Sequence, residues 1–137
     1  MKIVRILIAA LAVSVFSAIF AGVTCGGLFN WVYKLEPTNV WKAMEGPPGL
    51  VFYTGSFALN LVLVVVYALL NKGIPGKNKF IKGIIFGLCV WAVGTLPGML
   101  STYSFMTVAT GVVIYWTILG LVEVPLKGLI IAFIYGE

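Results

Sequence analysis

The segment Gly83–Val122, GIIFGLCVWAVGTLPGMLSTYSFMTVATGVVIYWTILGLV, runs for forty residues without a charged side chain. A bilayer core about 30 Å thick requires about 20 apolar residues per helix, so the segment is long enough for two crossings and a tight turn. A helix of a soluble domain usually keeps one polar face towards water, and this run has no such face. The segment therefore predicts a transmembrane hairpin.

Composition extends this interpretation to the whole chain. The 137 residues are 61% hydrophobic and 9% charged, whereas globular domains have about 25% charged residues. Because no polar stretch is long enough to enclose a separate core, we expect a single transmembrane domain over residues 1–137. The net charge of +5 comes from short loops beside apolar segments, where basic residues direct topology, so no nucleic-acid partner is expected.

The apolar segments predict an all-α, up-and-down bundle of four transmembrane helices at about residues 6–27, 49–70, 83–100 and 105–135. The loop between the second and third helices has no acid and four lysines, Lys72, Lys77, Lys79 and Lys82. The positive-inside rule places such a loop in the cytoplasm. We therefore expect a multi-pass protein of a cell inner (plasma) membrane with both termini cytoplasmic.

The residue types that support most metal and redox chemistry are scarce in this sequence. Histidine is absent, although haem b and most copper and zinc sites use imidazole, and no nucleotide-binding, CxxC or HExxH pattern occurs. Cys25 and Cys89 are expected near opposite membrane faces, too far apart for a disulfide, and so as free thiols. We expect no cofactor and no metal, and the sequence gives little support for catalysis.

Small residues recur at every fourth position of the first predicted helix: Ala10, Ser14, Ala18, Gly22 and Gly26. Residues at this spacing share one face, and small side chains let helices approach closely in lipid. The face predicts packing against another helix of this chain or, alternatively, a contact with a second copy or a partner subunit.

Polar and aromatic residues within the spans are the candidates for a membrane pocket. Asn60 is expected near mid-membrane, in an interhelical hydrogen bond or as a ligand contact. If Pro97 and Gly98 end the third helix and the hairpin folds about residues 102–103, Trp91 comes level with Tyr115 and Trp116. These three residues predict a packed aromatic cluster or a flat apolar pocket for a quinone, a lipid tail or an aromatic cation.

Glu123 and Lys127 are the charged pair that interrupts the last apolar segment. Glu four residues before Lys is the favourable order for a helical ion pair. Counted from Phe105, Glu123 lies about 27 Å along the helix, which favours a structural ion pair at the inner boundary. If the helix continues to Tyr135 through the bilayer, Glu123 is instead drawn into the membrane core, where carboxylates are usually functional.

The size and four-span plan resemble those of small multidrug transporters. The essential glutamate of that family lies in the first helix, where this chain has no acid after Arg5, so no residue role is carried over. The expected function is a non-catalytic structural or accessory subunit that packs in the lipid bilayer with itself or with other membrane subunits. The alternatives are a small oligomeric transporter or channel that uses Glu123 as a coupling carboxylate, and a membrane enzyme or binder acting on lipid or quinone.

Overall fold

The computed structural model describes residues 2–24, 27, 29–37, 39–41 and 49–136. All regular structure in these residues is helical, as expected. Four helices are long and apolar enough to cross a membrane: α1 (Ile3–Val23), α2 (Leu50–Leu70), the composite helix Lys79–Phe105, and α5 (Thr110–Tyr135). A short 3-10 helix, η2 (Asn30–Lys34), lies between α1 and α2.

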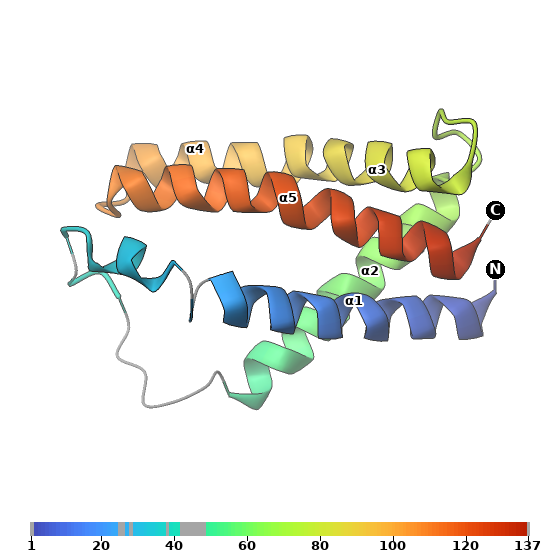
Figure 1. Cartoon of the computed structure of the whole chain (residues 1–137), viewed down its shortest axis with the longest axis horizontal. Helices are drawn as coiled ribbons and strands as arrows, with labels where there is room; N and C mark the ends of the chain where they lie inside the picture. The colour runs from blue at the N-terminus through green and yellow to red at the C-terminus, as the bar shows by residue number, and fades with distance from the viewer. Residues whose placement is uncertain (1, 25–26, 28, 38, 42–48, 137) are drawn as a thin grey trace.

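The four long helices run in alternating directions (Figure 1). The composite helix lies along α5, and α1 lies along the other side of α5, whereas α2 crosses obliquely. Both termini and the loop between α2 and α3 lie at the same end of the molecule, as an even number of alternating helices requires. This end is called the terminal end below.

The composite helix consists of α3 (Lys79–Val90), a π segment, η3 (Trp91–Thr95), and α4 (Leu96–Phe105). In the π segment the N–H of Leu96 donates to the carbonyl of Trp91, five residues earlier. Pro97 lies in the first turn of α4, where a missing N–H is tolerated. The expectation that Pro97 and Gly98 end the helix was therefore wrong: the helix continues to Phe105.

This continuation moves the hairpin turn. The chain turns at residues 106–109, between α4 and α5, instead of at residues 102–103. The last helix accordingly begins at Thr110, five residues later than predicted. The first helix, expected at residues 6–27, begins earlier, since α1 extends over Ile3–Val23; residues 25–26 of the predicted end lie outside the described residues.

Glycines bring α3 and α5 into backbone contact. A Cβ added to Gly83 would lie 2.6 Å from the carbonyl oxygen of Gly128. An added Cβ at Gly87 would overlap the backbone of Pro125, and one at Gly128 would overlap the carbonyl of Gly83. Gly83-x-x-x-Gly87 is thus a helix-packing motif of the kind found in membranes, and α5 is its partner.

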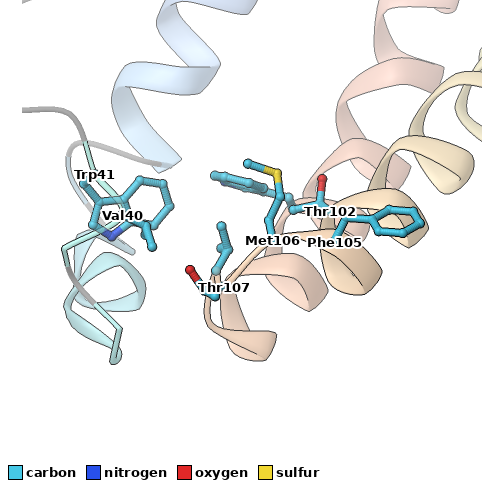
Figure 2. A pocket seen from close by; sticks show the side chains of 8 residues that line it. Val40, Trp41, Thr102, Phe105, Met106 and Thr107 are labelled. Carbon is cyan, nitrogen blue, oxygen red and sulfur yellow. The ribbon is translucent and has the colours of Figure 1, made fainter.

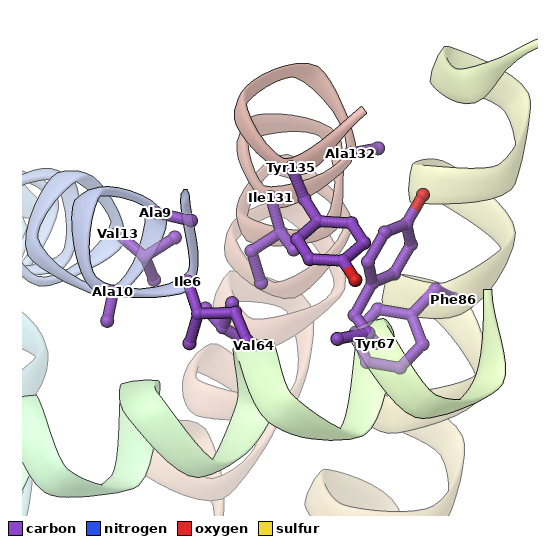
Figure 3. Close-up of a cluster of buried hydrophobic side chains, with 11 residues drawn as sticks. Ile6, Ala9, Ala10, Val13, Val64, Tyr67, Phe86, Ile131, Ala132 and Tyr135 are labelled. Carbon is purple, nitrogen blue, oxygen red and sulfur yellow. The ribbon is translucent and has the colours of Figure 1, made fainter. Parts of the chain in front are cut away.

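The main hydrophobic core, whose side chains Figure 3 shows, includes residues near both termini, such as Ile6 and Tyr135. It contains side chains from α1, α2, α3 and α5, among them Ile6, Val13, Val64, Tyr67, Phe86 and Ile131. Arg5 closes the terminal end by donating from Nη1 to the carbonyl of Tyr135 at 3.1 Å. In contrast, residues 50–55 at the opposite end of α2 are all exposed, so α2 diverges from the other helices there.

Candidate functional site

Asn60 joins α2 to α1. It is the middle residue of α2, is 5% exposed, and donates from Nδ2 to Oγ of Ser14 at 3.1 Å. Ser14 in turn donates to the carbonyl of Ala10 at 2.8 Å. The predicted interhelical hydrogen bond of Asn60 is confirmed, and the acceptor belongs to this chain.

The small-residue face of α1 divides into two parts. Ala10 is fully buried and Ser14 is partly buried against α2, so this half packs within the chain. Ala18 and Gly22 are exposed, and a Cβ added to Gly22 meets no described atom within 4 Å. Gly26 lies outside the described residues. Intramolecular packing therefore accounts for only the half of the face near the N-terminus.

Glu123 and Lys127 form the predicted ion pair. Lys127 Nζ lies 3.1 Å from Glu123 Oε1, and the two side chains are 18% and 21% exposed, respectively. Because α5 continues without interruption to Tyr135, Glu123 is the fourteenth of its 26 residues. Glu123 therefore lies near the middle of the helix, as expected for a helix that continues to Tyr135.

Asn60, Ser14 and the Glu123–Lys127 ion pair lie at similar heights along their helices. Arg5 contacts Tyr135 at one end of α1, and Thr24 accepts a hydrogen bond from Tyr115 at the other, so α1 and α5 are antiparallel and in register. Ser14 is nine residues from Arg5 and comes level with about residue 126, between Glu123 and Lys127. Asn60, Ser14 and the ion pair thus form a polar layer midway along the bundle.

Trp91 does not join Tyr115 and Trp116, contrary to the prediction. Its Nε1 donates to the carbonyl of Thr117 at 3.0 Å, and its ring lies against Gly120. The hairpin turns later in the sequence than predicted. The part of α5 that lies opposite Trp91 is therefore closer to the C-terminus than predicted. Trp91 remains at the middle of the composite helix, while Tyr115 and Trp116 lie near the start of α5.

Tyr115 and Trp116 instead belong to an aromatic cluster at the end opposite the termini. Trp116 Nε1 donates to Tyr33 Oη at 2.8 Å, and Tyr115 Oη donates to the carbonyl of Thr24 at 2.7 Å. Trp41 packs edge-on against Tyr33 and Trp116, with ring centroids 5.2 and 5.8 Å apart. The contact of Tyr33 and Trp41 with α5 was not predicted from the sequence, because no local pattern indicates it.

A cavity of about 490 Å³ adjoins this cluster (Figure 2). Trp41 lies on one side of it, and Thr102, Phe105 and Thr107 lie on the other. Its volume is within the usual range of about 300–1,000 Å³ for small-molecule sites. The indole N–H of Trp41 is buried without a hydrogen-bond partner among the described residues. The walls are suited to a largely apolar group.

Taken together, the described residues form an all-helical structure with four helices that are long and apolar enough to span a membrane. Comparisons with known protein families, with curated proteins and with solved structures find no match.

Proposed function

We propose that this chain is a non-catalytic membrane subunit that assembles with further transmembrane helices, either of a second copy or of a partner subunit. The observation that supports this proposal concerns which residues are already paired or packed within the chain. The polar layer is hydrogen-bonded or ion-paired within the chain, whereas several small-residue positions remain uncovered. In an apolar 18-residue window of each span, only 17–22% of the residues are buried inside the chain, which leaves ample helix surface for partners.

The uncovered positions include a second glycine motif, Gly94-x-x-x-Gly98. In a regular α-helix, residues seven apart lie on nearly the same face, so Gly94 would face α5 as Gly87 does. The π segment Trp91–Thr95, to which Gly94 belongs, contains more residues per turn and rotates the second motif away. An added Cβ at Gly94 or Gly98 meets no described atom within 4 Å. Such motifs drive close helix pairing in lipid, which supports this face as a contact site.

The proposed setting is an inner (plasma) membrane with the terminal end in the cytoplasm. The terminal end carries the loop of four lysines together with Lys2 and Arg5, and basic loops remain on the cytoplasmic side. Reaction of single introduced cysteines with an impermeant thiol reagent tests this orientation. Labelling at residue 77 in intact cells contradicts it.

Assembly can be tested with Gly98→Leu and Gly22→Leu. Overpacking a close contact costs about 1–3 kcal/mol, so we expect the dissociation constant of the complex to rise about 5- to 150-fold, as measured by native mass spectrometry or crosslinking in membranes. The matched control is Gly49→Leu, because Gly49 precedes α2 in an extended conformation with open space around it. If both variants retain the complex as wild type does, these positions are not the contact.

A small transporter or channel is the second candidate, and the position of Glu123 favours it. A carboxylate at mid-span is costly and is usually functional in membrane proteins. Under this alternative, Glu123→Gln abolishes pH-dependent flux in liposomes while the complex stays assembled. Flux that persists unchanged eliminates the coupling role of Glu123.

A further inference from the structure

An apolar groove separates the second half of α2 from the composite helix. It has a volume of about 590 Å³, and its walls include Val66, Ile74, Phe86, Cys89, Val90 and Val93. Along the composite helix the lining extends from Ile85 to Gly94, about 14 Å at 1.5 Å per residue. The groove therefore has the shape and the chemistry to hold a hydrocarbon chain.

One end of the groove lies at a loop that is rich in lysine. Gly73, Ile74 and Pro75 of the loop line it, and Lys72 and Lys77 flank these residues in the sequence. The segment 71–82 contains four lysines and no acid. An occupant with an apolar tail and a negatively charged head would match both parts of this surface.

Two of the four lysines are already engaged. Lys79 Nζ lies 4.9 Å from the ring centroid of Phe133, and Lys82 Nζ donates to the carbonyl of Asn71 at 3.0 Å. Lys72 and Lys77 are exposed, and the described residues supply neither of them with an ion pair or a hydrogen bond. Their charges are therefore available to a ligand.

We propose that the groove binds one acyl chain of an anionic phospholipid, and that Lys72 and Lys77 bind its headgroup. Each lysine near the surface adds about 1 kcal/mol of attraction to an anionic lipid, and a zwitterionic lipid of the same chain length lacks this contribution. Basic pockets beside membrane helices commonly bind anionic headgroups. The groove shares Gly94 with one glycine face of the proposed assembly, but Lys72, Lys77 and Cys89 lie outside both glycine faces, and lipid binding does not require the assembly.

The test compares phosphatidylglycerol with phosphatidylcholine of identical acyl chains, added to the detergent-purified full chain and followed by native mass spectrometry. We expect wild type to retain phosphatidylglycerol about 10- to 30-fold more strongly. The double variant Lys72→Gln/Lys77→Gln should lose this preference. The control Lys34→Gln, which changes an exposed lysine at the opposite end of the molecule, should keep it.

A second pair of variants tests the groove. Cys89→Phe places a ring in the groove and should reduce the retention of both lipids, as should Val93→Phe. Leu88→Phe alters an exposed neighbour on α3 that does not line the groove and should leave lipid retention unchanged.

Three outcomes would overturn the proposal. One is equal retention of the two lipids by wild type, and another is undiminished phosphatidylglycerol binding by both Cys89→Phe and Val93→Phe. The third is loss of a dimer in these variants without loss of lipid, which would make a second copy of the chain the occupant.

Discussion

Gly128→Ala should destabilise the protein more than alanine at any other glycine of α5. The added Cβ overlaps the carbonyl of Gly83 on α3, and backbone atoms cannot move aside unless the two helices separate. Overpacking costs about 1–3 kcal/mol where side chains can adjust, so we expect a loss of about 3 kcal/mol or more in the free energy of unfolding. Unfolding of the detergent-solubilised protein by SDS titration measures this loss.

Two further glycines provide graded controls. A Cβ added to Gly120 lies 3.2 Å from side-chain atoms of Trp91 and Thr95, which can shift, so Gly120→Ala should cost less than Gly128→Ala. Gly55 on α2 is surrounded by open space, and Gly55→Ala should stabilise the helix by up to about 1 kcal/mol. Equal stability of Gly128→Ala and Gly55→Ala would show that α3 and α5 are not in backbone contact.

After Gly128→Ala, Lys127→Met should cause the next largest loss in the free energy of unfolding. It leaves the carboxylate of Glu123 without its cation, on a side chain that is about four-fifths buried at mid-helix. Removing one partner of a buried pair costs about 3–5 kcal/mol, and insertion measurements put a charge at a helix centre at about 2.5–3.5 kcal/mol. We therefore expect a loss of about 2–4 kcal/mol, measured in the same titration.

The double variant Glu123→Gln/Lys127→Met distinguishes a lost ion pair from lost packing. If the unpaired charge is the cause, the double variant should recover to within about 1 kcal/mol of wild type. Glu123→Gln alone should cost less than Lys127→Met, because the long lysine stem can carry its charge towards the polar boundary. A double variant as unstable as Lys127→Met would mean that the lysine stabilises the fold through packing.

Much of the local structure could be predicted because it depends on residues close together in the sequence. Runs of apolar residues indicated four long helices, and the spacing of Glu123 and Lys127 indicated their pairing, since four residues make about one helical turn. The bond of Asn60 was also predicted, because an amide in an apolar helix requires a partner. The identity of that partner, Ser14, depended on how α2 crosses α1.

The main errors in the predicted structure concerned the hairpin formed by the composite helix and α5. Pro97 and Gly98 were taken as the end of the helix by their residue types, although the first turn of a helix accommodates proline. The resulting displacement of the turn separated Trp91 from Tyr115 and Trp116. Tyr33 and Trp41, which are distant in the sequence from α5, became their neighbours instead.

The sequence by itself determined the class of the protein, its four apolar helices and the ion pair of α5, because hydropathy and helical spacing act over one or two turns. Tertiary structure decided which surfaces remain open. The two glycine motifs Gly83–Gly87 and Gly94–Gly98 read alike in the sequence, yet one contacts α5 and the other does not. A change of helical pitch in the five residues Trp91–Thr95 rotates one motif away from the other, and hydrophobic periodicity carries no signal for it.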